Sequence, residues 1–386
     1  MKLTVTAVTT EDNNIDLEKV KIFSGKQAGI CYMSESYFSD KMKNTETAKK
    51  RFERTIPSLH HSIADHVNIT ILLEDLPKIV AMILNSLSQY ATSEKSGRYT
   101  MMKGSSEKEV IIYDKWKAIF EKEIKTEYPK IDEKTVVKLA MENARYLLSV
   151  FTPTTMAYTT TVRQWNYIMD WCDRFVNNKP VNKFEELLGA ELSKLKESLS
   201  FLYIDSMRDA KNRCFDFMAL QTNSPALDIK EEHFGDTYTA IYVATFVELA
   251  QAQRHRTLKY SMIFDPDNFN FYIPPIIAGK TLESEWMKDM QSLSDVYPQG
   301  ALVKVIERGM TEDFLLKCQE RLCGRAQLEI AIQTDKTLQK IHKSGAMPSL
   351  INEFINTNGT SKTKCQVLNC QERCIWGPKY GLNRMI

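Results

Sequence analysis

HVNITILL, at residues 66–73, is the stretch that decides the fold, because its side chains alternate between apolar and polar. Such alternation is typical of a half-buried β-strand. Pro77 suits the first turn of a helix, since proline lacks the N–H that a first turn leaves unpaired, and apolar residues then recur at helical spacing up to Gln89. Ser93 and Gly97 mark a loop. The segment therefore predicts a strand, a helix and a loop in that order.

The same order returns in the second half of the chain. Tyr238, Ala240 and Tyr242 alternate ahead of the helical run TFVELAQAQRHRTL, residues 245–258. Both halves also close with a long helical stretch. By apolar periodicity these stretches are residues 165–199 and residues 311–342.

This weak internal repeat predicts two lobes. A chain of 386 residues is long enough for two domains that each bury a core. We place the join near residue 200, which gives an N-terminal lobe over residues 1–199 and a C-terminal lobe over residues 200–342. Residues 343–386 begin with a polar stretch and are predicted to form an appended tail.

Composition and charge narrow the class of protein. With 43% hydrophobic and 26% charged residues, most of the chain is predicted to be ordered. The net charge is only +2, whereas proteins that bind long nucleic acid usually carry a stronger basic bias. We therefore expect no nucleic-acid partner, and a small anionic ligand held by local arginines.

The sequence gives no sign of export or of a membrane span. The opening residues lack the basic-then-apolar layout of a secretory signal. The longest uncharged stretch, residues 146–162, is rich in threonine and contains Pro153, so it makes a poor membrane helix. A cytoplasmic protein without a membrane partner is the expectation.

Eight cysteines are scattered without a disulfide-framework spacing, as expected of reduced thiols. Cys365, Cys370 and Cys374 near the end could bind zinc with His342, but their spacing fits none of the common two-pair patterns. Reduced thiols are favoured over a metal site.

Chemistry-bearing residues gather in three segments. HHSIADH at residues 60–66 precedes the first strand, and SEKSGRY at residues 93–99 follows the first helix. In the second half, Gln251 precedes the triplet RHR at residues 254–256. Gln251, Arg254 and His255 have the spacing i, i+3 and i+4, so a helix presents them on one face, while Arg256 points elsewhere.

These segments resemble the signature of the flavin-dependent thymidylate synthases. That family carries Gln-x-x-Arg-His-Arg and a downstream Glu-x-Ser-x-Arg in one chain. The first half of this sequence has SLS at residues 86–88 in place of Arg-His-Arg but keeps the downstream loop. The second half keeps Arg-His-Arg, whereas Met262, Phe264 and Pro266 occupy its downstream positions. Neither half is complete alone, and together they make one full set.

Later elements of the family are divided in the same way. Its Ala-Arg-x-x-Leu-Pro element is kept in part as Ala144 and Arg145, with Ser149 for the proline, and the second half carries Ser294 and Pro298 in the reverse arrangement. The family's arginine ahead of Ala-Gln-x-Glu-Ile is similar to Arg321 before AQLEI, residues 326–330, and the matching position in the first half is Cys172. The resemblance covers most of residues 20–335.

The resemblance implies an α+β fold of two tandem lobes, each with a central antiparallel sheet flanked by long helices. Family members are tetramers whose active sites take residues from several subunits. If two subunits were fused, each lobe would need to keep only the half that it contributes to one site. We therefore expect a composite site and a homodimer that imitates the family tetramer.

By resemblance, the chain methylates dUMP with FAD as cofactor and with methylenetetrahydrofolate and NADPH as co-substrates. Arg321 would contact the uracil and favour ionisation at its N3, because a fixed cation stabilises a developing anion. His60 would lie near the folate or nicotinamide, and Ser96 completes the predicted catalytic set. The substrate-binding residues would be Gln251, Arg254, Glu94, Ser96, Gly97, Arg98, Arg145 and Arg321. The cofactor-binding residues would be Ser62, Arg254, His255, Arg256, Glu94 and Arg163.

Arginines suit a nucleotide monophosphate, because planar guanidinium groups bind phosphate through paired charge-assisted hydrogen bonds. The candidates for the phosphate contact are Arg98, Arg145 and Arg254. Simpler alternatives stay open. The RHR triplet is also compatible with a solvated basic turn, His61 with a core histidine, and Arg145 with a surface pair to Glu142 or Asp173.

Three functions compete. The first is flavin-dependent thymidylate synthesis, and the second is transfer of another one-carbon group, such as hydroxymethyl, to a pyrimidine nucleotide. The third is nucleotide binding without catalysis, which departures from the family such as Ala91, Ser93 and Cys172 make plausible. Complementary losses favour an enzyme, because drift after loss of function would strike both copies of an element about equally often.

Overall fold

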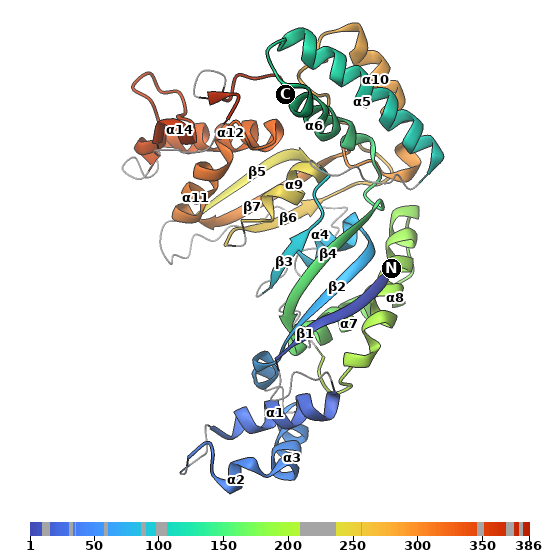
Figure 1. Ribbon diagram of the computed structural model, residues 1–386, viewed down its shortest axis with the longest axis vertical. Coiled ribbons are helices and arrows are strands. Elements are labelled where there is room, and N and C mark those ends of the chain that lie inside the picture. The colour runs from blue at the N-terminus through green and yellow to red at the C-terminus, as the bar shows by residue number, and fades with distance from the viewer. Residues whose placement is uncertain are drawn as a thin grey trace. The chain divides into compact units, whose positions relative to one another are not determined.

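The computed structural model describes residues 1–9, 16–30, 34, 36–57, 61–85, 90–97, 106–208, 237–255, 257–345, 351–367, 374–377 and 381–386. Its contacts divide the chain into two compact units. Unit 1 comprises residues 1–95 and 153–216, and unit 2 comprises residues 96–152 and 217–386. Figure 1 traces both from blue at the N-terminus to red at the C-terminus. Within the described ranges, no helix is long and apolar enough to cross a membrane.

Unit 1 is built on a four-stranded antiparallel sheet in the order β1-β2-β4-β3 (Figure 1). Its strands are β1 (Lys2–Val8), β2 (Asn68–Pro77), β3 (Ala91–Glu94) and β4 (Pro153–Thr161). Its helices are α1 (Leu17–Gly29), α2 (Asp40–Lys43), α3 (Thr45–Thr55), α4 (Lys78–Leu84), α7 (Val162–Asn177) and α8 (Lys183–Leu199). Two 3₁₀ turns are η2 (His61–His66) and η4 (Ser200–Leu202).

Strand β2 confirms the strand predicted from HVNITILL. Ile69, Ile71 and Leu73 are fully buried, because successive side chains of a strand point to opposite faces. Ile71 pairs with Tyr158 of β4, which is also buried. Helix α4 follows directly and buries every residue after Lys78. Strand and helix together therefore supply much of the core of unit 1.

Unit 2 is built on a three-stranded antiparallel sheet in the order β5-β7-β6. Its strands are β5 (Thr237–Thr245), β6 (Lys259–Ile263) and β7 (Leu302–Met310). Its helices are α5 (Glu107–Glu127), α6 (Glu133–Ala144), α9 (Phe246–Ala252), α10 (Thr281–Gln291), α11 (Thr311–Arg321), α12 (Leu328–Ser344) and α14 (Lys364–Val367). Short 3₁₀ turns are η3 (Arg145–Leu147), η5 (Ser294–Val296) and η6 (Asn352–Phe354).

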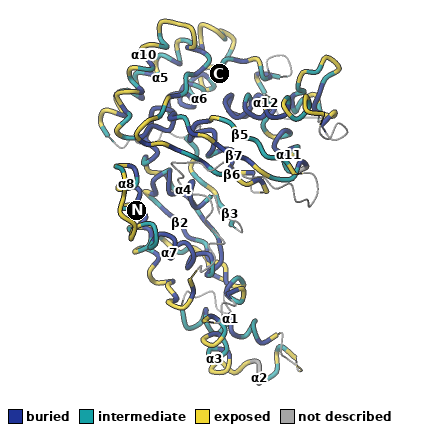
Figure 2. Tube along the Cα trace, turned by 180° about the vertical axis from the view of Figure 1, so that it is seen from behind, coloured by how far each residue is buried: buried dark blue, intermediate teal, exposed yellow. Residues whose placement is uncertain are grey.

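Aromatic side chains hold α5, α6 and α10 together, and Figures 1 and 2 both show these helices side by side. The rings of Trp116 and Trp286 meet edge to face with centroids 4.8 Å apart. Trp376 and Ile386 are buried in the same cluster, and Arg384 donates a 2.6 Å hydrogen bond to the Ala326 carbonyl oxygen. Trp376, Arg384 and Ile386 near the end of the chain are therefore packed into unit 2, and this part of residues 343–386 is not an appended tail.

The two sheets repeat one topology, which supports the predicted duplication. The first repeat is β2-α4-β3 followed by β4-α7-α8, and the second is β5-α9-β6 followed by β7-α11-α12. In each, the strand that comes last in sequence lies between the other two, as β2-β4-β3 and β5-β7-β6. Ser149 and Pro298, the positions matched from sequence, pair with each other in an antiparallel bridge. The predicted α+β fold with antiparallel sheets and flanking helices is confirmed.

Several predicted elements are shorter than expected. Residues 165–199 are not one helix, because the chain breaks around Pro180 between α7 and α8, where proline cannot continue a helix. The stretch over residues 311–342 likewise breaks between α11 and α12. Helix α9 ends at Ala252, well before residue 258. Ser93 lies in strand β3 rather than in a loop, because it pairs with Ala157.

The division by contacts differs from the boundary predicted near residue 200. Residues 96–152, assigned to the N-terminal lobe by sequence, belong to unit 2. The reason is packing: α5 and α6 bury their apolar faces against Trp286, Met290 and their neighbours from the second half. The boundary near residue 200 therefore separates the two sequence repeats, whereas the contacts divide the chain into units that each pack around their own core.

Candidate functional site

The site in unit 2 is built around the start of α9. Thr245 precedes the helix, and its hydroxyl oxygen accepts the Glu248 N–H at 3.1 Å, which caps the first turn. The Thr245 hydroxyl and N–H also donate to the Glu329 carboxylate, at 2.7 Å and 2.8 Å. Glu329 stands near the start of α12. The two helix starts are thus tied together, and this tie fixes the direction in which α9 presents Gln251.

Gln327 contacts two of the predicted substrate-binding residues, Arg145 and Gln251. Its side-chain oxygen accepts hydrogen bonds from both Arg145 Nη2 and Gln251 Nε2. Its side-chain nitrogen donates to the Tyr146 hydroxyl, which in turn donates to Glu329 Oε2 at 2.9 Å. Burial and the Glu329 carboxylate raise the pKa of Tyr146 well above its usual value, so the hydroxyl stays a donor. Arg145 and Gln251, far apart in sequence, therefore share one acceptor.

Arg321 and His255 form a second pair beside this network. Arg321 Nε donates to His255 Nε2 at 2.8 Å, and Glu320 Oε2 lies 3.6 Å from Arg321 Nη2. Burial, with the Arg321 and Lys317 charges, lowers the pKa of His255 to about 3. The imidazole is therefore neutral and accepts at Nε2 while Nδ1 carries the proton. A fixed arginine oriented by a neutral histidine is suited to polarising an anionic ring.

Motif matching did not assign a role to several members of this network. Gln327 and Glu329 belong to AQLEI, which was noted only as a marker for Arg321, and Tyr146 directly follows Arg145. Thr245 stands at the matched position of Pro77, one residue before the equivalent helix. The alternation of polar and apolar residues within AQLEI is a signal that could have found Gln327 and Glu329.

In unit 1, two predicted site residues form ion pairs. Glu94 Oε1 lies 2.5 Å from Lys78 Nζ, and the Glu94 side chain is only 5% exposed. Arg163 Nη2 lies 2.7 Å from Asp65 Oδ2, and the other carboxylate oxygen of Asp65 accepts the Thr161 hydroxyl at 3.1 Å. Asp65 therefore links Arg163 to Thr161 and holds the Arg163 guanidinium in place.

The remaining predicted residues are placed as follows. Ser62 and Arg254 are exposed, and Ser96 and Gly97 are half-buried. His60, Arg98 and Arg256 lie outside the described residues. Their predicted roles stay predictions.

The simpler alternatives are settled in part. His61 is a buried core histidine, since its Nδ1 meets the Tyr167 hydroxyl at 2.7 Å and its Nε2 the Ile56 carbonyl oxygen at 3.1 Å. Arg145 donates to Gln327, and Asp173 is bonded by Lys196. Among the described residues no group of three metal-binding side chains occurs, and Cys370 lies outside them.

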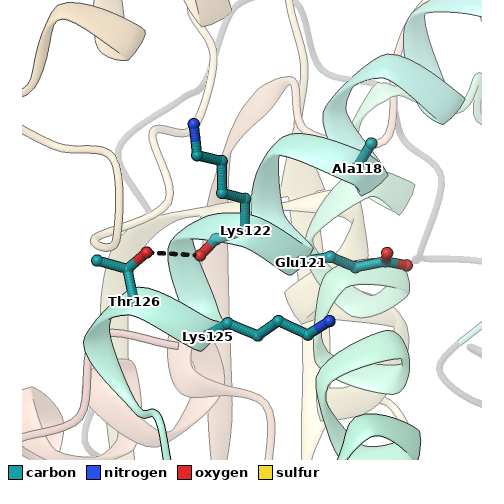
Figure 3. Close-up of a pocket in the computed structure, with 5 residues that line it drawn as sticks. All are labelled: Ala118, Glu121, Lys122, Lys125 and Thr126. Atoms are coloured by element: carbon teal, nitrogen blue, oxygen red, sulfur yellow. Dashed lines mark hydrogen bonds between the residues drawn. The ribbon is translucent and has the colours of Figure 1, made fainter.

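A hollow of about 460 Å³ lies on the surface of α5, outside this network (Figure 3). It is lined by Ala118, Glu121, Lys122, Lys125 and Thr126. The Thr126 hydroxyl donates to the Lys122 carbonyl oxygen at 2.9 Å within the same helix. Since its residues all come from one exposed helix, the hollow offers no convergent polar groups for a substrate.

FAD, which the resemblance implies, is an anionic dinucleotide that needs cations and donors. Arg163, Arg254 and the exposed hydroxyl of Ser62 are of that chemical type. Glu94 is not, because its carboxylate is nearly buried and already paired with Lys78. In chemical type, the described candidates other than Glu94 are compatible with a flavin, and Arg163 among them is already paired with Asp65.

Comparison with known proteins gives a family match in the first half of the chain. Residues 24–172 match the family described as Thymidylate synthase complementing protein, which confirms the resemblance found in the motifs. A solved structure of Thymidylate Synthase X (ThyX) from Helicobacter pylori with FAD and dUMP is 15% identical and covers 54% of this chain and 99% of its own, at a TM-score of 0.32. A UMP/dUMP methylase PolB from Streptomyces cacaoi is 11% identical and covers 52% of this chain and 95% of its own, at a TM-score of 0.33. No curated protein matches the sequence.

Proposed function

From the match of residues 24–172 to the family described as Thymidylate synthase complementing protein, we propose that this chain transfers a one-carbon group to carbon 5 of dUMP. The product would be dTMP, with FAD as cofactor and with methylenetetrahydrofolate and NADPH as co-substrates. The observation that carries the proposal is the network in which Arg145 and Gln251 meet at Gln327 while Arg321 is held by His255.

The network suits a nucleotide because it combines cations with amides in fixed positions. Arg145 and Arg254 would bind the phosphate, and Arg321 would polarise the uracil. His255 would keep Arg321 oriented, because a neutral imidazole accepts from the guanidinium without adding charge. When bound, the reduced flavin supplies the hydride that converts a transferred methylene into a methyl group. The side chains bind and orient, while the cofactor performs the redox step.

We propose one such site per chain. At the positions of Gln251 and Arg321, counted from the starts of α4 and α7, the first repeat has Ile83 and Cys172, both buried. An apolar face of this kind cannot bind a phosphate. The loop that carries Glu94, Ser96, Gly97 and Arg98 would instead complete the site of the second repeat, either within a chain or across a homodimer.

Calorimetric titration with dUMP tests the composite site. Arg98→Ala and Arg254→Ala should each weaken binding by at least about tenfold, because each removes a charged partner from the same phosphate. Lys122→Ala is the matched control, since Lys122 is an exposed cation on α5 that lines only the surface hollow. Normal dUMP binding by either arginine variant would mean that the composite site is wrong.

Nucleotide binding without catalysis is the second candidate, and the Lys78–Glu94 pair favours it because a predicted flavin residue is already engaged. The two functions differ in a direct measurement. An enzyme copurifies with flavin and oxidises the reduced cofactor in the presence of dUMP, whereas a binding protein takes up dUMP without flavin. The mass of the product distinguishes methyl transfer from transfer of another one-carbon group.

A further inference from the structure

A fully buried ion pair lies under the sheet of unit 2. Glu307 Oε2 and Lys317 Nζ are 2.5 Å apart, and both side chains are completely shielded from solvent. Lys317 also donates to Gln333 Oε1 at 3.0 Å, and Glu307 accepts the Tyr242 hydroxyl at 2.9 Å. Burying charges is costly unless they are paired and hydrogen-bonded, and this pair is both.

Glu248 adds an uncompensated carboxyl group to the same interior. It is the third residue of α9 and is fully buried. In the described part of the chain, neither of its carboxyl oxygens has a hydrogen-bond partner, and the same holds for the Tyr260 hydroxyl. Burial raises the pKa of Glu248 to about 8, against the opposing effect of Lys317. The group is therefore mostly neutral near pH 7.

The fold itself does not require these charges, because the first repeat lacks them. Helices α4 and α9 have equal lengths, as do strands β4 and β7. Counted from the starts of α4, β4 and α7, the positions equivalent to Glu248, Glu307 and Lys317 belong to Val80, Tyr158 and Ile168. All three are buried and uncharged. The second repeat thus has two carboxylic acids and one lysine where the first repeat has uncharged core residues.

The charged cluster lies one helical turn behind the proposed nucleotide site. Glu248 precedes Gln251 by three residues on α9, and Lys317 precedes Arg321 by four residues on α11, so each pair shares a helix face. The charged groups that act on Glu248 are Lys317 and Arg321 from α11, Glu307 from β7 and Glu329 from α12. The hydroxyls of Tyr242 from β5 and Tyr260 from β6 face the same interior.

We propose that Glu248 is a proton-binding positioning residue of the nucleotide site, and that it must be neutral for an anionic nucleotide to bind beside Arg321. The proposal rests on the proposed function. With Glu248 neutral, the two charges of Glu307 and Glu329 balance those of Lys317 and Arg321. Ionised Glu248 adds a negative charge that repels the phosphate. Anion binding in turn favours protonated Glu248, so the Glu248 carboxylate takes up a proton from solvent when the nucleotide binds above neutral pH.

The test is a dUMP titration from pH 7 to pH 9.5 with wild type, Glu248→Gln and Lys122→Ala. Wild type and the Lys122 control should lose about tenfold in affinity per pH unit above the Glu248 transition, whereas Glu248→Gln should show no such decline. At pH 8, calorimetry in buffers of different ionisation enthalpy should detect proton uptake with wild type and none with the glutamine variant. Glu248→Val is a second variant, because the equivalent Val80 shows that the fold accepts valine there.

The outcomes separate the two proposals. If wild type binds no dUMP at pH 7, the proposed function fails and this inference fails with it. If wild type binds dUMP and all variants share one pH profile and one proton uptake, only the role of Glu248 is overturned. Circular dichroism of each variant at pH 7 checks that the fold is retained.

Discussion

At the residue scale, the side-chain amide of Gln327 forms hydrogen bonds with three other side chains. Arg145 and Gln251 donate to its oxygen, and its nitrogen donates to Tyr146. Gln327 itself is 3% exposed, so water cannot readily replace a lost bond. A buried polar network of this kind is stable only while each member is satisfied.

Gln327→Leu should therefore destabilise the chain and weaken nucleotide binding. Leaving its partners without this amide costs roughly 1–3 kcal/mol of unfolding free energy, and dUMP affinity should fall by about tenfold or more as Arg145 and Gln251 lose their common anchor. Denaturant unfolding and calorimetry measure the two effects. The exposed Gln291→Leu is the control. An unchanged denaturation midpoint for Gln327→Leu would contradict the network.

Glu248 gives stability a pH dependence that can be measured without any ligand. Its pKa is about 8 in the folded chain against a reference value of 4.5, so between these values the folded state holds more protons than the unfolded state. The free energy of unfolding should therefore be highest at low pH, where Glu248 is neutral in both states, and should fall as pH rises towards 8. The size is on the order of 3–5 kcal/mol at most.

Glu248→Gln should remove this loss, so its advantage over wild type should grow from pH 5 to pH 8. Urea unfolding at several pH values measures it. Glu127→Gln, at an exposed position, should follow the wild-type curve. Parallel curves for Glu248→Gln and wild type would show that the carboxyl group titrates normally.

At the element scale, the turn η3 places Arg145 and Tyr146 through close packing against Gly300. A Cβ atom on Gly300 would lie 2.9 Å from both the Cβ and the carbonyl oxygen of Tyr146 and 2.7 Å from the Met290 side chain. The Gly300 N–H also donates to the Tyr146 carbonyl oxygen at 2.7 Å. Only glycine allows the chain to approach η3 this closely.

Gly300→Ala should push η3 away, lower stability by about 1–3 kcal/mol and weaken dUMP binding. Gly189→Ala, in α8, is the matched control, because the nearest atom to a Cβ there is Cε1 of Phe175, at 4.0 Å. Since alanine favours helix, that variant should gain up to about 1 kcal/mol. Thermal melts compare them, and equal melting temperatures for the two variants would contradict the close approach.

At the scale of the whole molecule, the end of the chain closes the core of unit 2. The rings of Trp376 and Tyr128 meet edge to face with centroids 5.1 Å apart, and the Met385 N–H donates to the Tyr128 hydroxyl at 3.0 Å. Ending the chain after residue 373 would expose these surfaces. We expect a lower melting temperature and aggregation. Trp376→Ala alone should cost about 3 kcal/mol or more, and truncation without loss of stability would refute this role.

The sequence by itself determined the secondary structure of the strongest segments, and it indicated both a repeat and a resemblance to the family that residues 24–172 match. Residue type and local periodicity were enough for β2, β5 and the divided motifs, because a strand's alternation and a helix's spacing are properties of neighbouring residues. Tertiary structure alone decided which polar groups meet. Gln327 accepts a hydrogen bond from Arg145, α5 and α6 belong to unit 2, and the carboxyl oxygens of Glu248 have no hydrogen-bond partner among the described residues. These outcomes depend on burial and on partners distant along the chain, which no local pattern encodes.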